Sequence, residues 1–356
     1  MNAQPTVEYA GVAYPLKGRD AELSAFEARF DTGNWSTPVV VTGPAGIGKT
    51  ALVKAFEAIA CERGWRALYD APSKGLTQRM SGIYLPGIHE NLTGKICDDF
   101  DCMSLEEQLK MVAEGLQTLG EGLLITIDTL PRGAAANLRE LVSAVVRVTE
   151  LGLPVQLVLA GRGQDARDLL AAEGMEALAS AEQIDLGALT RAQTEETLRQ
   201  VWESCRVHSG KTCEVTQELL QRASLATYGY PYMVQLVGER IRRKAVDQQL
   251  TEEQLICELA AAQEALGALV LGPLLEKLSA GDRAFLEAMA EDDSSSKMSD
   301  IAARLGKNPQ YAGVYRNRLV EAQIIRAASY GKVTFVIPHL RDYLRAHRAE
   351  DSFDTF

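Results

Sequence analysis

The chain has 356 residues, of which 46% are hydrophobic and 24% are charged. These values exclude a disordered or fibrous chain and leave room for two or three globular domains, each with its own core. The formal net charge is −11 at pH 7, which excludes indiscriminate binding of nucleic acid by the whole surface.

The charge is unevenly distributed along the chain. The segment 297–348 contains ten basic and three acidic residues, so it carries +7 and leaves −18 for the rest. Such an asymmetry predicts a basic module attached to an acidic main body.

The first eleven residues lack the basic and apolar regions of a secretion signal, and no uninterrupted apolar run is long enough to span a bilayer. We therefore expect a cytoplasmic protein with no membrane partner. The six cysteines are scattered without a Cys-x-x-Cys pair, so free thiols are expected rather than a zinc site or a disulfide framework.

The first predicted helix follows Gly18 and Arg19 and carries apolar side chains at Phe26 and Phe30. A turn residue before a helix cap accounts for this pattern structurally. A β-branched strand at 39–41 comes next, and it leads directly into a glycine-rich segment.

The glycine-rich segment has the spacing Gly-x-x-x-x-Gly-Lys-Thr of a phosphate-binding loop, and an amphipathic helix at 51–61 follows it. The glycines let consecutive backbone N–H groups point at an anion, and the helix adds the positive end of its dipole. Lys49 is expected to reach the β- and γ-phosphates, and Thr50 to hold Mg²⁺. The predicted nucleotide-binding residues of this segment are Gly43, Pro44, Ala45, Gly46, Ile47, Gly48, Lys49, Thr50 and Ala51.

A short strand is predicted at 65–69, and an irregular region with a helix around 76–92 follows it. This region is long for a passive connection, so it is either an ordinary insertion or a surface for a substrate or partner. Ser104 then caps a further helix.

A buried strand at 123–128 ends in Asp128, the position at which a P-loop enzyme holds the hydration shell of Mg²⁺. These motifs resemble those of hydrolytic AAA+ ATPases, in which the next residue is usually a glutamate that orients the attacking water. Here the next residue is Thr129, whose hydroxyl cannot usefully accept a proton near neutral pH. Slow hydrolysis is therefore expected, unless a carboxylate from elsewhere, such as Glu140, acts as the base.

A helix at 137–149 and a strand at 155–160 follow, and the strand leads to Arg162. Arg162 is either a contact to the γ-phosphate or a solvated arginine in a glycine turn. A last strand at 183–186 completes an alternating pattern of strands and helices. This pattern predicts an α/β domain over residues 1–188, with a parallel sheet covered by helices on both faces.

From Leu189 the pattern is helical, which predicts an all-α lid domain over residues 189–270. The sequence Tyr-Gly-Tyr-Pro at 228–231 separates two of its helices. The remaining residues, 271–356, are predicted to form a winged helix-turn-helix whose third helix covers 310–322 and whose wing covers 324–337.

The third helix of this C-terminal domain alternates tyrosines and arginines with Val314 and Leu319. One of its faces is therefore expected to pack while another contacts bases and phosphates. The residues predicted to bind DNA are Lys307, Gln310, Arg316, Arg318 and Lys332.

Taken in chain order, these motifs resemble AAA+ ATPases of the origin-recognition-like and STAND-like group, and the resemblance covers nearly the whole chain. It implies that Arg162 is a sensor of the γ-phosphate. It also implies further nucleotide contacts from Gly18 and Arg19 near adenine, from Gly229 and Pro231 on adenine, and from His339 at the β-phosphate. A structural histidine at a helix start is an equal interpretation of His339. No arginine finger is recognisable, so the sequence does not support assembly into a ring.

Two functions are compatible with these observations. The first is a weak ATPase that binds ATP or ADP with Mg²⁺ and uses its nucleotide state to control double-stranded DNA binding by the winged helix. The second is a STAND-like scaffold whose winged helix is autoinhibitory and whose output is oligomerisation or binding of a protein partner. A nucleotide that serves only as a structural cofactor is a third possibility.

Overall fold

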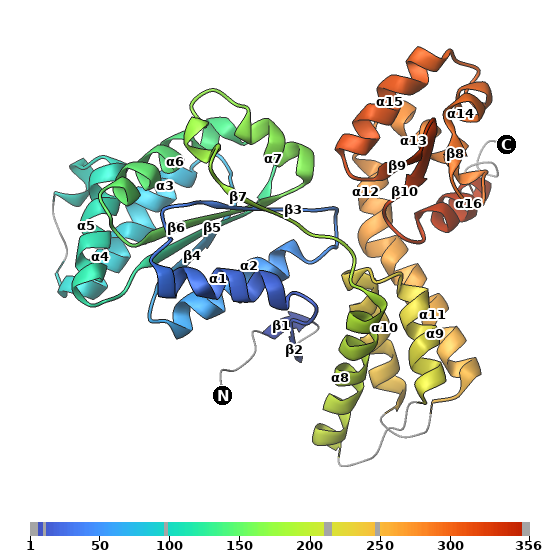
Figure 1. The fold of residues 1–356 in the computed structure, drawn as a ribbon, viewed down its shortest axis with the longest axis horizontal. Helices are drawn as coiled ribbons and strands as arrows, with labels where there is room; N and C mark the ends of the chain where they lie inside the picture. The colour runs from blue at the N-terminus through green and yellow to red at the C-terminus, as the bar shows by residue number, and fades with distance from the viewer. Residues whose placement is uncertain (1–5, 10–11, 96–98, 210–215, 246–249, 351–356) are drawn as a thin grey trace. The chain divides into compact units, whose positions relative to one another are not determined.

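The computed structural model describes residues 6–9, 12–95, 99–209, 216–245 and 250–350. The chain divides into two compact units (Figure 1). The first comprises Met1–Gly43 and Lys49–Leu186, and the second comprises Pro44–Gly48 and Gly187–Phe356. The phosphate-loop turn is therefore grouped with the C-terminal unit, although its flanking strand and helix belong to the first. Each unit is described by itself below.

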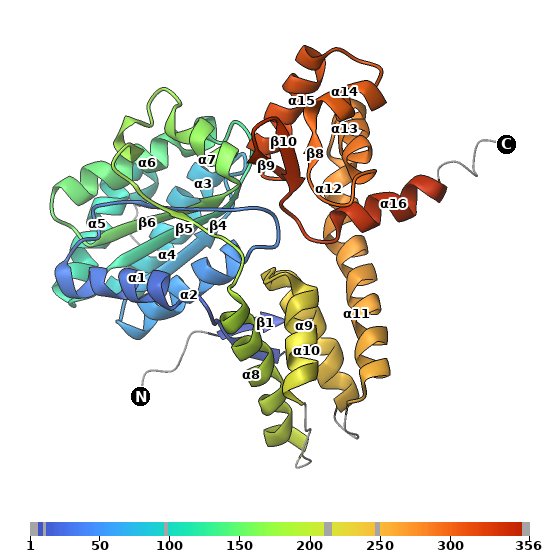
Figure 2. The same cartoon turned by 45° about the vertical axis from the view of Figure 1, so that its right-hand side comes forward.

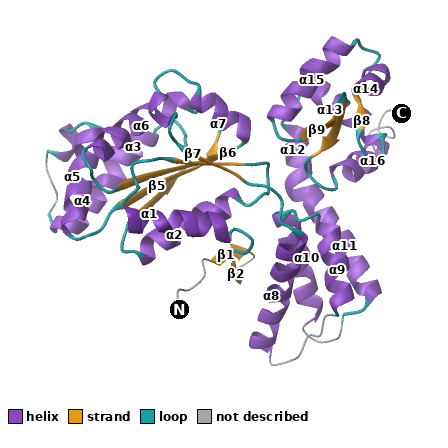
Figure 3. Cartoon of the chain, viewed as in Figure 1, coloured by secondary structure: helices purple, strands orange, loops and turns teal. Residues whose placement is uncertain are grey.

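The first unit is built on a parallel sheet of five strands in the order β4-β5-β6-β3-β7 (Figure 3). Strand β3 pairs with β6 on one side and β7 on the other, so the strand before the phosphate loop is internal. The predicted parallel sheet is confirmed. The strands are β3 (Val39–Thr42), β4 (Arg66–Asp70), β5 (Leu123–Leu130), β6 (Val155–Gly161) and β7 (Glu182–Asp185).

Helices cover both faces of this sheet, because β5 and β6 are mostly apolar and are buried along nearly their whole length. Figure 1 shows α1 and α2 on one face and α6 and α7 on the other. The helices are α1 (Asp20–Thr32), α2 (Lys49–Glu62), α3 (Leu76–Arg79), α4 (Leu85–Thr93), α5 (Leu105–Thr118), α6 (Ala135–Glu150) and α7 (Gly163–Leu170).

The predicted helix at 76–92 is interrupted in the structure. A π-helical turn, η1 (Met80–Tyr84), separates α3 from α4. Short 3₁₀ turns occur at Phe100–Cys102 and Glu176–Leu178. The predicted cap at Ser104 is confirmed as a capping box with Glu107. An antiparallel hairpin of β1 (Thr6–Tyr9) and β2 (Val12–Pro15) was not predicted.

The second unit begins with the helices of the predicted lid, which are α8 (Arg191–Ser209), α9 (Gln217–Thr227), α10 (Pro231–Ala245) and α11 (Glu252–Leu266). The last of them continues through a π-helical turn, η4 (Gly267–Leu271), into α12 (Gly272–Glu276). The predicted division after residue 270 therefore falls inside one continuous helix. Two glycines in it, Gly267 and Gly272, leave room for the ring of Tyr343.

This continuous helix, Glu252–Glu276, is long and apolar enough to cross a membrane by length and composition alone. The sequence analysis expected no such segment. One candidate is weak grounds for a membrane span, because core helices of soluble proteins meet the same criterion. In this structure α11 packs against α10 and α9 of the lid.

The C-terminal part has the winged helix-turn-helix fold that the sequence predicts (Figure 2). A three-stranded antiparallel sheet in the order β8-β10-β9 packs with four helices. The hairpin closes at Ser329 and Lys332 as predicted, whereas β8 was not predicted. The elements are α13 (Ala280–Ala290), β8 (Ser296–Lys297), α14 (Met298–Arg304), α15 (Pro309–Glu321), β9 (Ile325–Ser329), β10 (Lys332–Phe335) and α16 (Leu340–Glu350).

Candidate nucleotide-binding site

The phosphate-loop sequence lies where a phosphate loop should lie, between the end of β3 at Thr42 and the start of α2 at Lys49. Gly46 and Gly48 have φ values of 74° and 98°, a left-handed conformation that favours glycine. Lys49 Nζ donates a hydrogen bond of 2.8 Å to the carbonyl oxygen of Gly43, so the side chain folds back over the loop. The ammonium group is thus held at the helix terminus where an anion binds.

The environment of Lys49 is electrostatically unusual. Burial is the main cause that lowers the pKa of its ammonium group to about 8, and the charge of Arg162 lowers it further. The carboxylates of Asp128 and Asp165 act in the opposite direction. A buried ammonium with a lowered pKa marks a place where an added negative charge, such as a phosphate, is strongly favoured.

The predicted metal ligands Thr50 and Asp128 lie side by side. The hydroxyl of Thr50 donates a hydrogen bond of 2.5 Å to Oδ2 of Asp128, which is 2% exposed. A hydroxyl and a carboxylate are oxygen ligands of the kind that Mg²⁺ prefers, so the two residues fit this ion. They come from α2 and β5, and the packing of α2 against β5 brings them together.

Strand β5 is irregular directly after Asp128. Its pairing with β6 shifts register between Ile127 and Leu130, and Thr129 has a φ of 62°. A β-branched residue rarely adopts this left-handed conformation, so the backbone here is strained. The amide of Thr129 donates a hydrogen bond of 2.6 Å to Oδ1 of Asp128. Glu140, the alternative base, lies on the exposed side of α6.

Arg162 caps the N-terminus of α7 directly after β6. Its Nε donates a hydrogen bond of 2.7 Å to Oδ2 of the buried Asp165, and 44% of its side chain is exposed. Its charge acts on the Lys49 ammonium, so the guanidinium belongs to the same electrostatic site. The structure places Arg162 near the loop, and its role as a sensor stays a prediction.

The box at Gly18 and Arg19 forms the entry to α1. Gly18 has a φ of 73°, and the carbonyl of Arg19 accepts the first hydrogen bond of the helix from Leu23. The Arg19 side chain is buried and lies 3.6 Å from the carboxylate of Glu22. Burial lowers the pKa of its guanidinium. These contacts explain the box as a helix start, and contact with adenine stays a prediction.

In the second unit, the loop residues 44–48 contact the predicted Tyr-Gly-Tyr-Pro segment. The hydroxyl of Tyr230, which is 2% exposed, donates a hydrogen bond to the carbonyl of Ala45. The amide of Tyr232 donates one of 3.3 Å to the carbonyl of Gly46. A Cβ at Gly46 would lie 2.6 Å from the Tyr230 hydroxyl, so glycine is required there for packing as well as for conformation.

The predicted adenine contacts Gly229 and Pro231 have clear structural roles. Gly229 has a φ of 68°, and a Cβ there would lie 2.1 Å from the carbonyl of Leu189. Its own carbonyl accepts a hydrogen bond of 2.8 Å from the Leu189 amide. Pro231 is the first residue of α10, where a proline needs no N–H partner. Contact of either residue with a nucleotide stays a prediction.

His339, the predicted contact to the β-phosphate, lies at a junction inside the second unit. Only 7% of its side chain is exposed. Nε2 lies 2.9 Å from the carbonyl of Ala226 in α9, and Nδ1 lies 3.1 Å from Nε2 of Gln263 in α11. Both ring nitrogens therefore have partners from lid helices. These contacts match the alternative interpretation of a structural histidine at the start of α16.

The predicted DNA-binding residues divide into two groups, according to whether the side chain forms an ion pair within the domain. Arg318 is in the first group, which forms such a pair. Its guanidinium donates a hydrogen bond of 2.8 Å to the buried carboxylate of Asp282 and lies over the ring of Tyr315. Tyr315 in turn fills the space above Gly281, where a Cβ would lie 2.4 Å from its ring. Arg318 and Tyr315 thus attach α15 to α13.

The second group faces solvent. Lys307 and Gln310 are exposed at the start of α15, and Arg316 is partly exposed. Lys332 lies directly opposite Lys297 in the β8–β10 pair. Val314 was expected to pack but is 57% exposed, whereas Leu319 packs as expected. Val314 faces outward because the inner side of α15 is filled by Ala312, Tyr315 and Leu319.

The net charge of the C-terminal module corrects the sequence analysis. Residues 271–356 contain twelve basic and twelve acidic residues, because the window 297–348 excluded acidic residues both before it and after it. The structure shows that the acidic residues before this window neutralise the arginines. Arg304 pairs with Asp292 and Arg345 with Asp293, while Arg341 donates to backbone carbonyls of the same loop. The module is therefore neutral overall.

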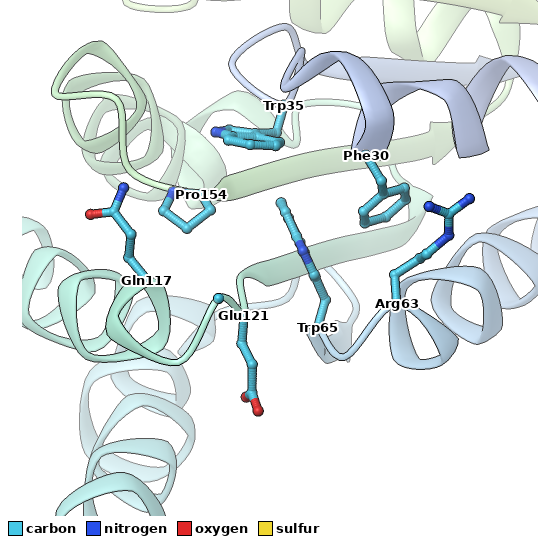
Figure 4. A pocket seen from close by; sticks show the side chains of 8 residues that line it. Phe30, Trp35, Arg63, Trp65, Gln117, Glu121 and Pro154 are labelled. Atoms are coloured by element: carbon cyan, nitrogen blue, oxygen red, sulfur yellow. The ribbon is translucent and has the colours of Figure 1, made fainter.

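A cavity of about 310 Å³ lies at the opposite edge of the first unit's sheet (Figure 4). Its lining residues immediately precede β4, β5 and β6 or lie close to them, so it is at the amino ends of the strands. The phosphate loop follows the carboxyl end of β3, so the cavity is not part of this site. It is lined by Phe30, Trp35, Arg63, Trp65, Gln117, Gly120, Glu121 and Pro154.

Two tyrosines at the site were missed by the sequence analysis. The sequence predicts a functional role for neither residue: Tyr230 lies between the predicted nucleotide contacts Gly229 and Pro231, and Tyr69 ends a predicted strand. Tyr69 donates a hydrogen bond of 3.2 Å to Oδ2 of Asp128, and burial is the main cause that raises its pKa to about 12. The available signal was the position of Tyr69 near the end of β4, the strand that precedes the Asp128 strand β5 in chain order. The three described cysteines are free, and no metal-binding cluster of His, Cys, Asp and Glu occurs among the described residues.

The first unit has the fold of an AAA+ P-loop domain. Residues 15–179 match the AAA ATPase domain family, and residues 268–344 match a domain of unknown function (DUF8462). A search of curated proteins finds no match to the chain.

Comparison with solved structures covers nearly the whole chain. The ORC2 protein of Aeropyrum pernix, solved as ADPNP-ADP complexes, has a TM-score of 0.63 and 16% identity and covers 94% of this chain and 96% of that chain. Its ADP form has a TM-score of 0.50 and 14% identity, with coverage of 93% and 95%. At this identity the similarity shows the fold. The predicted origin-recognition-like AAA+ fold is thus confirmed.

Proposed function

We propose that the protein is an ATP-binding switch whose nucleotide state controls the binding of double-stranded DNA by its winged helix. The observation that carries the nucleotide part is the convergence of Lys49, Thr50 and Asp128 at the end of β3 and β5. A buried ammonium and a hydroxyl–carboxylate pair are the groups that a Mg²⁺-bound triphosphate requires. The ORC2 structure with ADPNP and ADP supports adenine nucleotides as the ligand.

Each residue has a distinct role in this proposal. Lys49 neutralises the β- and γ-phosphates, and Thr50 and Asp128 hold Mg²⁺, which neutralises charge on the phosphates when bound. Arg162 contacts the γ-phosphate and so distinguishes ATP from ADP. Hydrolysis is slow, because Thr129 stands where a carboxylate would orient the attacking water. The ATPase acts as a timer in the cytoplasm.

The link from nucleotide to output lies within the second unit. Tyr230 and Tyr232 bind the carbonyls of Ala45 and Gly46, so a change in the loop's conformation alters the start of α10. Helix α11 packs on α10 and continues into the winged helix-turn-helix through α12. A ligand that binds one loop conformation preferentially shifts the population of these elements.

The proposed DNA binding depends on cationic side chains of the wing and of α15 that are exposed or partly exposed. Lys297 and Lys332 lie directly opposite each other, an arrangement that is unfavourable unless an anion approaches. Lys307, Gln310 and Arg316 lie on or beside α15, the helix that enters the major groove in this fold. Arg318 is partly engaged by Asp282, so in this proposal it contributes less to DNA binding than the other cations.

A second candidate function is a STAND-like scaffold that oligomerises or binds a protein partner. The neutral charge of residues 271–356 favours it, as do the exposed Val314 and Tyr330. Exposed apolar side chains are typical of protein interfaces.

The test is a DNA retardation series with ATP, with ADP and without nucleotide, each across a range of salt concentrations. We expect binding that differs between nucleotide states and falls steeply with salt, because each phosphate contact releases a counterion. Equal binding in all three states would contradict the switch. Binding that is absent at low salt, together with nucleotide-dependent self-association by light scattering, would favour the scaffold.

A further inference from the structure

Tyr69 is the last residue but one of β4, and its side chain is part of the metal site. Tyr69 pairs with Thr126 of β5, and Asp128 lies two residues further along β5. Residues two apart in a strand share a face. The phenol therefore lies on the side of the sheet to which Asp128 points, and its hydroxyl donates a hydrogen bond of 3.2 Å to Oδ2 of Asp128.

Asp128 needs such support because the strand that carries it becomes irregular. The register shift between Ile127 and Leu130 interrupts the pairing with β6 at Asp128, and the positive φ of Thr129 ends the regular strand geometry directly after it. Three donors hold the carboxylate instead. The Thr129 amide donates to Oδ1 at 2.6 Å, and the hydroxyls of Thr50 and Tyr69 donate to Oδ2 at 2.5 and 3.2 Å.

Binding of Mg²⁺ would affect the three hydrogen-bond donors differently. Mg²⁺ would take the Thr50 oxygen as a ligand, and the Thr129 amide follows every movement of the strand end. The Tyr69 hydroxyl comes from a neighbouring strand and is not a predicted ligand. Residue Tyr69 is 45% exposed, so its hydroxyl can be removed without opening a cavity in the core.

We propose that Tyr69 is a positioning residue for Mg²⁺, because its hydroxyl fixes the orientation in which Asp128 receives the ion. This inference rests on the proposed function, since it assumes that nucleotide and Mg²⁺ bind at the phosphate loop. It assigns to Tyr69 the Mg²⁺-dependent part of nucleotide binding and no part of the contact between the loop and the phosphates.

The experiment is calorimetric titration of a non-hydrolysable ATP analogue into wild type and Tyr69→Phe, once with EDTA and once with Mg²⁺. We expect the ratio of affinities with and without Mg²⁺ to fall about tenfold in the variant, the value of one hydrogen bond to a charged group. Affinity in EDTA should be unchanged. Tyr330→Phe is the matched control, because Tyr330 is fully exposed on the wing.

An unchanged ratio in Tyr69→Phe would overturn the proposal. An equal loss in EDTA and in Mg²⁺ would overturn it as well, because it would show a structural role of the ring. Failure of the wild type to bind the analogue in Mg²⁺ as well as in EDTA would instead refute the proposed function, and this role with it.

A second measurement tests the contact without any nucleotide. Urea unfolding of wild type, Tyr69→Phe, Asp128→Ala and the double variant forms a double-mutant cycle. We expect Tyr69→Phe to lower the unfolding midpoint in the wild-type background and to leave it unchanged in the Asp128→Ala background. Equal effects in both backgrounds would show that the hydroxyl does not support the carboxylate and would overturn the proposal.

Discussion

The phosphate-loop site and the winged helix-turn-helix differ in how their functional residues are arranged. At the loop, Lys49 and Thr50 are adjacent in sequence at the start of α2, and they meet Asp128 because α2 packs against β5. On the winged helix, the predicted residues are scattered over a helix, a turn and a hairpin. One of them, Arg318, also binds Asp282 of the same domain, with 51% of its side chain exposed. A contiguous motif is thus a stronger guide to function than a count of charges.

The largest expected effect concerns the loop. Lys49→Ala removes the ammonium group that would neutralise the phosphates, so we expect adenine nucleotide affinity to fall about 100-fold, which corresponds to about 3 kcal/mol. Fluorescence titration with a labelled ADP measures this loss. Lys54→Ala is the matched control, since Lys54 is exposed on the same helix. Similar nucleotide affinities for Lys49→Ala and Lys54→Ala would show that the contiguous motif is no better a guide to function than the scattered charges of the winged helix.

The division of the predicted DNA contacts is tested by two arginine substitutions. Arg318→Ala leaves the buried carboxylate of Asp282 without its cationic partner, with only the hydrogen bonds from Ser279, so we expect a loss of about 1 kcal/mol in the free energy of unfolding. Its effect on the salt dependence of DNA binding should be small. Arg316→Ala should reduce the magnitude of the slope of log K against log salt by about one and leave stability unchanged. The reverse result for the two arginines would show that this division is incorrect.

The strained backbone at Thr129, beside Asp128, predicts a smaller effect on the free energy of unfolding, opposite in sign to that of Arg318→Ala. Thr129→Gly removes the side chain from a residue with a φ of 62°, so we expect the unfolding free energy to rise by about 0.5 kcal/mol. Thr129→Ala retains a Cβ in the same conformation and should gain less. Urea unfolding compares both variants with the wild type. A destabilised Thr129→Gly would indicate that the threonine side chain makes a contact that outweighs the strain.

The smallest expected effect depends on pH and belongs to the winged helix. Hydrogen bonds from Arg304 are the main cause that lowers the pKa of Asp292 to about 2. Because the folded-state pKa is below the unfolded one, the pair stabilises the domain above about pH 4 and loses this contribution as pH falls toward 2. We expect Asp292→Asn to unfold with a weaker pH dependence between pH 5 and 3. Asp300→Asn, at an exposed carboxylate, should keep the wild-type dependence.

The order of elements in both units was largely predictable because it depends on local signals. Apolar runs predicted β3, β5 and β6, and the cap at Ser104 is a capping box in the structure. The hairpin β1–β2 and the short β8 were missed, since two to four residues are too few for a periodic pattern. The π-helical turns were missed because they leave no distinct sequence signal.

The sequence by itself determined that a phosphate-binding loop precedes a helix and that an aspartate ends a later strand, because these features depend on residue type and spacing along the chain. Only the tertiary structure decided which side chains surround that aspartate and which arginines remain available to a partner. Tyr69 reaches Asp128 through strand order, and Arg318 is engaged by Asp282, which lies 36 positions away in sequence. Such pairings depend on packing between distant segments, which local pattern does not encode.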